Sequence, residues 1–347
     1  MATISISSPL DDYPLTSQIG DISAQTDSSK ETVSLLNADS GHVLFTTTLY
    51  SFDGTVTLHD AASLIEEDMR NAGVSFRNYM LTIGDASIKI NPVYCECVAP
   101  DLSVHDSFLT TFHSQRVYPD SMYVLNSVPN EDDVSLICLF KESDGSVGTH
   151  IFHAHAKAFS SGCARGSFAV LHATLNRALG RDVDMIAVTF RNGHRSKTYY
   201  ILPGSPVVRF YFRNCFNAFD YMDLHGAIKK KTAVSRELAV CAGSASQYDR
   251  KINQTFDFQS EGLTEQESLS IAQIVSSHEV YLTDGNSFER ILITDHTCDI
   301  DNNDDSLWTV KISWRYKDNR PHLSKEQISH LHMDGGIFTN EFTEQFL

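Results

Sequence analysis

Residues 207–318 constrain the fold more than any other part of this chain. Apolar and aromatic side chains alternate along three segments, as they do in strands that bury one face. One helix interrupts them: Thr264 and Glu267 form a capping box, in which hydroxyl and carboxylate each satisfy a free N–H of the first turn. The expected strands are 207–212, 291–294 and 308–316. The pattern predicts a β-rich module with one capped helix over 206–322.

Turn residues predict antiparallel strands in the rest of the chain. Asn192-Gly193 separates two apolar segments, and Gly accepts the positive φ that a two-residue hairpin needs. Phe52-Asp53-Gly54 predicts a second hairpin, between 43–50 and 55–58, and helices are expected after Asp60 and over 167–179. The expected fold class is mainly β or α+β, with two or three sandwich- or barrel-like domains, short helices and extended terminal arms.

Composition shifts divide the chain into four expected segments. Residues 1–40 are rich in Ser, Thr and Asp without sustained periodicity, which predicts an extended N-terminal arm. Residues 41–205 read as one or more β-rich domains with two helices and a sub-boundary near 130. Pro203-Gly204-Ser205-Pro206 then marks the boundary to the 206–322 module. Residues 323–347 are expected to dock on this subunit or a neighbour, because Phe342 and Phe346 are too apolar for a free tail.

Charge and cysteine usage exclude several classes of protein. The 347 residues carry a net charge of -17, which argues against nucleic-acid binding and against binding to anionic membranes. The seven cysteines are odd in number and scattered, so we interpret them as reduced thiols rather than a disulfide framework. The longest apolar runs are strand-sized and the N-terminus lacks signal-peptide features, so synthesis in a cytoplasm and no membrane partner are expected.

A metal-dependent hydrolase is one interpretation that the histidines leave open. His153 and His155 would face the same side of a strand, and His172 or Asp184 would have to supply a third ligand. Two histidines without a carboxylate specify little, so an exposed or interfacial strand face is the favoured interpretation. The chain has no nucleophile elbow, phosphate loop or zinc-protease motif, and no catalytic residue or cofactor is expected.

Two charged segments are candidates for contacts between subunits. Lys229, Lys230 and Lys231 form the only basic run and are expected in a connector. An acidic loop over 295–305 could receive them from a neighbouring subunit, although two solvated loops explain the same charges. The loop starts like a calcium site but lacks the glycine and the glutamate that such a site requires. Its interface candidates are Asp299, Asp301, Asp304 and Asp305.

The C-terminal module also resembles a known group of proteins. Its patches recur, in this order, in virion tail proteins of phages and prophages of Bacteroidetes-type bacteria, and residues 50–60 resemble a hairpin in their N-terminal halves. The patches are Val207 to Phe212, Ala245 to Asp249, Gly262 to Glu267, Val280 to Leu282, Ile293 to Asp295 and Trp314 to Pro321. The match covers roughly two thirds of the chain in patches of structural residues, and residues 100–200 match less clearly.

The resemblance implies a non-enzymatic structural component of a phage tail: a ring, hub or baseplate subunit. Its partners would be copies of itself in a ring and other tail, neck or baseplate proteins, with DNA only as passing cargo. It would be made in the bacterial host cytoplasm and located in the virion tail. The family has no active-site residues to carry over.

A receptor- or glycan-binding β-sandwich at a tail tip is the alternative. Exposed aromatic rings on strands could stack on sugars. The candidates are Tyr199, Tyr200, Tyr211 and Tyr221.

Overall fold

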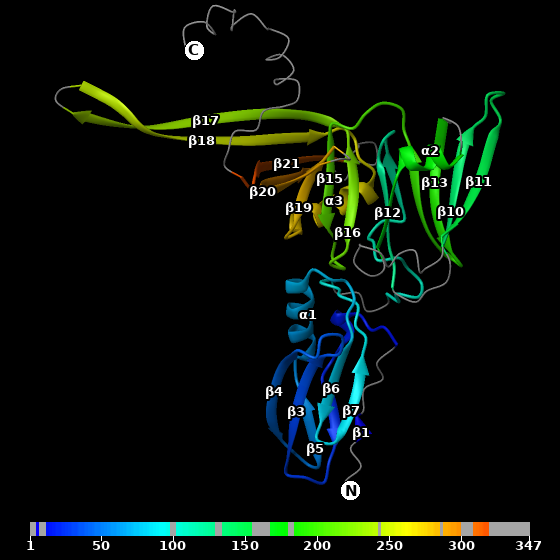
Figure 1. Cartoon of the computed structure of the whole chain (residues 1–347), viewed down its shortest axis with the longest axis vertical. Coiled ribbons are helices and arrows are strands. Elements are labelled where there is room, and N and C mark those ends of the chain that lie inside the picture. Colours follow the sequence, from blue (N-terminus) through cyan, green and yellow to red (C-terminus); the bar gives the residue numbers. More distant parts are fainter. Residues whose placement is uncertain are drawn as a thin grey trace, which may run out of the picture.

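The computed structural model describes residues 5–6, 12–97, 102–128, 134–154, 167–179, 184–241, 244–284, 287–299 and 308–318. Strands dominate these ranges, in several sheets with few short helices, so the expected mainly β class with sandwich-like domains is confirmed. Three groups of strands follow one another along the chain. In Figure 1 the first group forms the lower part of the molecule, and the other two lie side by side above it.

The first group is a two-layer domain with its core between two sheets and one helix. One sheet has the order β1-β2-β5 and the other the order β4-β3-β6-β7. Fully buried side chains such as Val33, Ile65 and Leu81 bring both layers and α1 into one core. The elements are β1 (Ser5–Ile6), the short 3-10 helix η1 (Thr16–Gln18), β2 (Ile22–Gln25), β3 (Lys30–Asn37), β4 (Val43–Tyr50), β5 (Thr55–Leu58), α1 (Ala61–Ala72), β6 (Tyr79–Ile83) and β7 (Ala86–Ile90).

Two expectations for this region are corrected. Most of the expected arm over 1–40 is core structure, because β2 and β3 pair within the sheets and bury Ile22 and Leu35 completely. The expected hairpin at Asp53-Gly54 is a corner between the layers, since β4 pairs with β3 and β5 pairs with β2. Only the bridge from Phe52 to Thr55 joins the two strands.

The second group forms a middle domain with a five-stranded sheet of order β11-β10-β13-β14-β8 and the separate pair β12-β9. The expected hairpin is confirmed, but its turn lies one residue later, at Gly193-His194, because Asn192 still pairs with Arg195; Gly193 has φ 56°. The helix expected over 167–179 is half strand, because Phe168 and Val170 pair with β9 before the helix begins. The elements are β8 (Ser114–Val117), β9 (Met122–Asn126), β10 (Val134–Lys141), β11 (Val147–Ala154), β12 (Ser167–Leu171), α2 (His172–Leu179), β13 (Asp184–Asn192) and β14 (Arg195–Ile201).

The third group is a seven-stranded sheet of order β16-β15-β19-β20-β21-β18-β17, with α3 packed on it. Phe210, Ile274 and Trp314 are at most 1% exposed in its core. The chain passes from the first group of strands to the second between residues 90 and 114, and from the second to the third between 201 and 208. The first of these boundaries lies upstream of the sub-boundary expected near 130. The elements are β15 (Val208–Arg213), β16 (Phe219–Leu224), β17 (Gly226–Cys241), β18 (Ser244–Ser260), α3 (Glu265–Ser276), β19 (Val280–Thr283), β20 (Phe288–Asp299) and β21 (Thr309–Tyr316).

The expected capping box begins α3 and also ties two domains together. Thr264 accepts from the N–H of Glu267, and Glu267 accepts from the N–H of Thr264 at 2.9 Å. The same carboxylate accepts from Arg116 Nε of β8 at 2.6 Å. Burial alone would raise the pKa of Glu267, but the hydrogen bonds from Arg116 and Thr264 outweigh it, and the pKa is lowered.

A buried ion pair joins the middle domain to the third. Lys197 Nζ of β14 lies 2.8 Å from Asp220 Oδ1 of β16, and the two side chains are 1% and 0% exposed. Thr110 and Asn214 donate to the other carboxylate oxygen, at 2.9 and 2.8 Å, and Lys197 also donates to the carbonyl of Val124. Because every charge here is paired and hydrogen-bonded, the two domains form one body.

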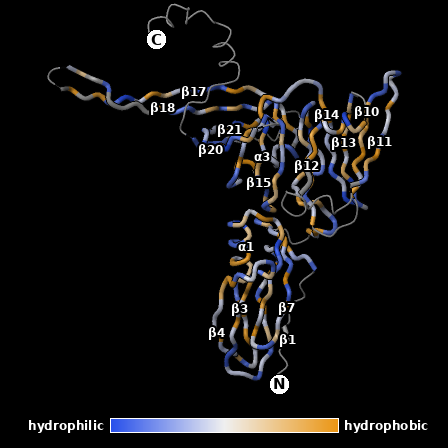
Figure 2. Tube along the Cα trace, in the orientation of Figure 1, coloured by the Kyte–Doolittle hydropathy of each residue, from blue (hydrophilic) through white to orange (hydrophobic). Residues whose placement is uncertain are grey.

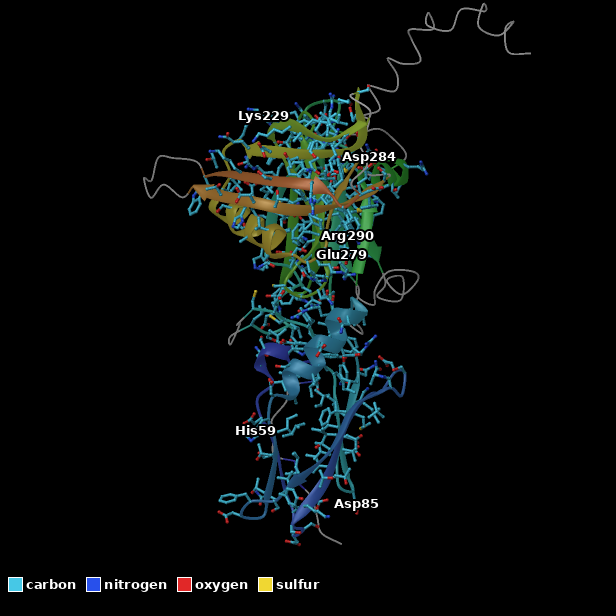
Figure 3. All side chains as sticks on the ribbon, turned by 90° about the vertical axis from the view of Figure 1, so that its left-hand side faces the viewer. His59, Asp85, Lys229, Glu279, Asp284 and Arg290 are labelled. Carbon is cyan, nitrogen blue, oxygen red and sulfur yellow. The ribbon has the colours of Figure 1, made fainter. Side chains whose placement is uncertain are left out.

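The turn between β15 and β16 attaches the first domain to this body. Asn217 Nδ2 donates to the carbonyls of Met69 and Val74, both at 3.0 Å. Arg213 Nη1 donates to the carbonyl of Gly73 at 3.0 Å, while its Nε pairs with Glu279. Figure 3 shows Glu279 on the side of the body that faces the first domain. Hydrogen bonds and ion pairs therefore attach both the first domain and the middle domain to the third domain.

Candidate assembly surface

A two-stranded arm, formed by β17 and β18, extends from the third domain (Figure 1). The strands have 16 and 17 residues and pair with each other from Gly226 to Cys241. Only residues 256–259 of β18 also pair with β21. The twelve residues of β18 before them, 244–255, at about 3.3 Å each, carry the arm roughly 40 Å past the last shared pairing.

One face of the arm, called its apolar face below, holds the exposed large apolar residues of β17 and also Lys230, Thr232 and Arg236. Successive strand residues point to opposite faces, so the even-numbered residues of β17 share one face. All its exposed large apolar residues are even-numbered, with Leu238 66% and Val240 74% exposed. Their face continues the core side of the sheet, where Phe256 and Phe258 of β18 pack on Trp314. Figure 2 shows the hydrophobic segments along the arm.

The opposite face of β17 is polar or small. Its odd-numbered members include Lys229, Lys231, Ala233, Ser235 and Glu237. The arm therefore has an amphipathic pattern of the kind that buries one side of a sheet, yet the described residues place nothing over its apolar side beyond the body.

The arm also has free edges. β17 is the last strand in its sheet, and within the described residues β18 has no second neighbour over 244–255. A two-stranded ribbon is marginally stable in water by itself, and an exposed edge is a template for another strand. The arm therefore has the properties of a segment that pairs with a strand of another chain.

A hollow of about 270 Å³ opens at the base of the arm. Its lining includes Ile252 and Thr255 of β18 on one side and Arg315 and Tyr316 of β21 on the other. It lies where β18 separates from β21, so backbone edges of both strands border it. The space is wide enough for side chains of an inserted segment.

The three lysines lie on the arm, and not in a connector as expected. They occupy β17 because no Gly, Pro, Asn or Asp interrupts the strand between Gly226 and Cys241. Lys230 lies over the ring of Phe256 on the apolar side, at 5.7 Å. Lys231 pairs with Asp257 of the same arm at 2.5 Å and is 58% exposed. Figure 3 shows Lys229 at the outer surface of the body.

The predicted contact between the lysines and the acidic segment has a counterpart within the chain. Lys229 faces Asp257, Asp257 faces Ser313, and Ser313 faces Asp295 across three neighbouring strand pairs. Asp299 ends β20, so the first part of the expected acidic loop is strand. Asp301, Asp304 and Asp305, and Phe342 and Phe346 of the C-terminal segment, lie outside the described residues. The predicted contact with a neighbouring subunit stays a prediction.

The structure does not bring the candidate metal ligands together. His153 is exposed on β11 and contacts Ser135, whereas His155 lies outside the described residues. His172 is buried and bonds Tyr123 at 2.6 Å, and Asp184 begins β13 at the opposite end of the sheet. Among the described residues, no group of three or more His, Cys, Asp or Glu side chains is placed to hold a metal ion.

A small polar cavity of about 60 Å³ gathers several titratable groups between the middle and third domains. Arg116 pairs with Glu267 there, and His225 lies 2.9 Å from Glu261. Asp223 accepts from Ser121 and from Tyr221, and burial raises the pKa of its carboxyl. These groups satisfy one another, so the cavity is explained by packing between the domains.

A cluster of aromatic rings lies on the outer side of the third domain. Tyr211 stacks on Phe219 with 4.5 Å between ring centroids, and Phe288 and Tyr281 lie within 6.5 Å of Tyr211. Phe288 is 47% exposed.

The four tyrosines proposed for sugar stacking separate in the structure. Tyr199 and Tyr221 are buried, while Tyr200 is 51% exposed on the middle domain. Only Tyr211 belongs to the aromatic cluster of the third domain.

The arm itself was missed at the level of sequence. Its signal is the run from Ala227 to Cys241, which contains no Gly, Pro, Asn or Asp and is nearly three times the usual strand length of 5–6 residues, with apolar residues at 234, 238 and 240. The triple lysine obscured this signal, because charges at the base of the arm look like a solvated loop.

No protein-family model and no curated protein matches this chain. Among solved structures, the crystal structure of Dpr2 Ig1-Ig2 in complex with DIP-Theta Ig1-Ig3 aligns over 93% of this chain and 91% of that chain. The sequence identity is 8% and the TM-score is 0.20, so this similarity carries no argument about fold or function. No helix in the described part of the chain has the length and hydrophobicity needed to span a membrane.

Proposed function

We propose that this chain is a non-enzymatic structural subunit of a bacteriophage tail, in a ring, hub or baseplate, and that it assembles with copies of itself through the β17–β18 arm. The arm is the observation that carries the proposal. It combines free strand edges, an exposed apolar face and a length of roughly 40 Å beyond the body. Addition of a strand to such an edge is a common mode of protein recognition.

Charge favours another copy of this chain as the partner. β17 carries four basic residues and one acidic residue, a net charge of +3, whereas the chain as a whole carries -17. Three of these bases lie at the base of the arm, and the projecting residues 232–255 keep one net positive charge, from Arg236, Arg250 and Lys251 against Glu237 and Asp249. A positive segment is attracted to the acidic body of a second copy. Contact between the arm of one subunit and the body of the next is heterologous, and such contacts generate a ring where the rotation closes.

The sequence patches over 207–321 and 50–60 support the assignment to a tail. Neighbouring tail, neck or baseplate proteins would be further partners, and the virion its location after synthesis in the host cytoplasm. The net charge of -17 would let DNA pass as cargo without binding, because like charges repel. Phe342 and Phe346 remain candidates for locking neighbouring subunits.

The oligomeric state of the purified full chain tests the proposal. We expect sedimentation velocity to show discrete higher oligomers at micromolar concentration, and negative-stain microscopy to show closed rings. The arm contact includes lysines, so the oligomers should weaken as salt is raised. A species that stays monomeric over the whole concentration range would contradict the proposal.

The receptor- or glycan-binding alternative is favoured by the aromatic cluster of Tyr211, Phe219, Tyr281 and Phe288. Flat rings at a surface offer large contact area at a low cost in side-chain entropy. We expect a glycan-array signal that is lost in the Tyr211→Ala variant and kept in Tyr200→Ala, since Tyr200 lies outside the cluster. An array without any signal would remove this alternative and leave the assembly role unaffected.

A further inference from the structure

Three cysteines meet where the first domain joins the body. Cys95 and Cys97 follow β7, and Cys215 lies in the turn between β15 and β16. The backbone N–H of Glu96 donates to the carbonyl of Cys215 at 2.9 Å. The two segments therefore run side by side, with Cys95 and Cys97 flanking the residue that is bonded to Cys215.

The thiols themselves are in contact. The side chains of Cys95 and Cys215 are hydrogen-bonded to each other, and the side chain of Cys97 also reaches Cys215. Cys95 is 1% and Cys215 6% exposed, within a small apolar core at the junction, while Cys97 is exposed. The three thiols are not arranged as a metal site.

Hydrogen bonds hold both backbones in place. Cys95 N–H donates to Thr16 Oγ1 at 2.9 Å, and Thr16 Oγ1 donates to the Cys95 carbonyl at 3.2 Å. Cys215 N–H donates to Gln273 Oε1 of α3 at 2.9 Å. Cys95 and Cys215 are thus neighbours on two fixed backbones, and a disulfide forms between cysteines that are held close together.

We propose that Cys95 and Cys215 form a disulfide across this junction when the protein meets a low-molecular-weight disulfide, and that the exposed Cys97 is the entry thiol. The Cys97 thiolate attacks one sulfur of the disulfide RSSR, which gives a mixed disulfide and releases one thiolate RS⁻. A proton passes from Cys215 to the Cys95 thiolate along their hydrogen bond, and the Cys215 thiolate attacks the Cys97 sulfur and expels the second RS⁻. The released RS⁻ takes the proton from Cys95. Cys95 then attacks the Cys215 sulfur and returns Cys97 to its thiolate form. Two protein thiols are oxidised, and RSSR is reduced to two RSH.

The acidity of Cys95 supports the last exchange. Its hydrogen bond with Cys215 lowers the pKa of Cys95 to about 7, although burial works in the opposite direction. The same hydrogen bond, together with burial, raises the pKa of Cys215, so the pair holds its thiolate on Cys95. The thiolate is the attacking species in disulfide exchange. Near neutral pH, a large fraction of Cys95 is therefore in the reactive form.

The bond would join residues far apart in the chain, one in each of two domains. It would fix the first domain on the body after the protein leaves a reducing compartment, because glutathione and thioredoxin keep such thiols reduced in a cytoplasm. The proposal is independent of the assembly role, since none of its residues lies on the arm.

Mapping of thiols in the full-length protein tests the proposal directly. The reduced protein is incubated with glutathione disulfide at pH 8, alkylated, digested without reductant and analysed by mass spectrometry. We expect a peptide pair joined through Cys95 and Cys215, alkylated Cys97 and a raised midpoint of thermal unfolding. Alkylation of all three cysteines, or a final bond that excludes either Cys95 or Cys215, would overturn the assignment.

Single substitutions separate the roles of the three thiols. Cys215→Ser is expected to abolish the cross-link, and Cys97→Ser to slow its formation at least tenfold without changing the bonded pair. Cys138→Ser is the matched control, because Cys138 is fully buried in the middle domain, and it should cross-link at the wild-type rate. An unchanged rate in Cys97→Ser would refute the entry role.

Discussion

Replacing Asp220 by alanine is expected to lower the free energy of unfolding by about 3–5 kcal/mol, because it leaves the ammonium group of Lys197 buried without its counter-charge. Both side chains are at most 1% exposed, so water cannot replace the lost carboxylate. The substitution also removes the acceptor of Thr110 and Asn214. Equilibrium denaturation in urea, followed by circular dichroism, measures the loss.

Two further variants make this result specific. Asp106→Ala removes an exposed carboxylate that lies 3.0 Å from His194, and it should leave stability unchanged within error because exposed pairs are worth little. Adding Lys197→Met to Asp220→Ala should recover part of the loss, since no charge then remains buried. A single Asp220→Ala variant within about 1 kcal/mol of the wild type would contradict the buried pair.

The pair also predicts how stability depends on pH. Burial lowers the pKa of Lys197, but the charge of Asp220 outweighs it, so the pKa in the folded state is raised above the ordinary value. The stabilisation of the folded state by charged Lys197 is therefore fully present below about pH 10.4, the pKa of lysine in an unfolded chain. It is lost as the pH rises through the higher folded value. Asp220→Ala should show its largest deficit at neutral pH and a smaller one in strong alkali.

Local chemistry made some elements predictable and not others. The capping box at Thr264 and the hairpin at Gly193 are each specified by a few neighbouring residues; the capping box appears where it was expected, and the hairpin turn lies one residue later. The Asp53-Gly54 turn is equally local, but a turn does not determine whether its flanking strands pair. Here the partners of β4 and β5 are β3 and β2, which lie elsewhere in the sequence.

The same limit explains the expected N-terminal arm and the missed arm of β17 and β18. Ile22 and Val33 are sparse apolar residues in a polar segment, and they become core only because α1 and the second sheet cover them. Conversely, Leu238 and Val240 look like core residues in sequence but extend past the body. In both cases, contacts with segments far away in the sequence determine whether a residue is buried, and the periodicity of the sequence does not reveal those contacts.

Placing aspartate at both Leu238 and Val240 is expected to abolish self-association of the full chain. If another copy covers the apolar face of the arm, assembly would bury two carboxylates, and the one at position 240 has no basic neighbour on its face. A buried unpaired charge costs several kcal/mol, and about 3 kcal/mol already weakens association by roughly 100-fold. Sedimentation velocity should show the double variant as a folded monomer at concentrations where the wild type forms oligomers.

The matched control carries the same charges on the opposite face of the same strand. Ala233→Asp with Ser235→Asp adds two carboxylates to the polar face, so this variant should assemble as the wild type does. A shortened arm gives an independent measure: Thr232 faces Gln254, so an Asn-Gly turn between them closes the hairpin and removes 233–253. That protein should be a stable monomer. Oligomers that survive both the shortened arm and the two aspartates of the apolar face would show that the copies meet through another surface.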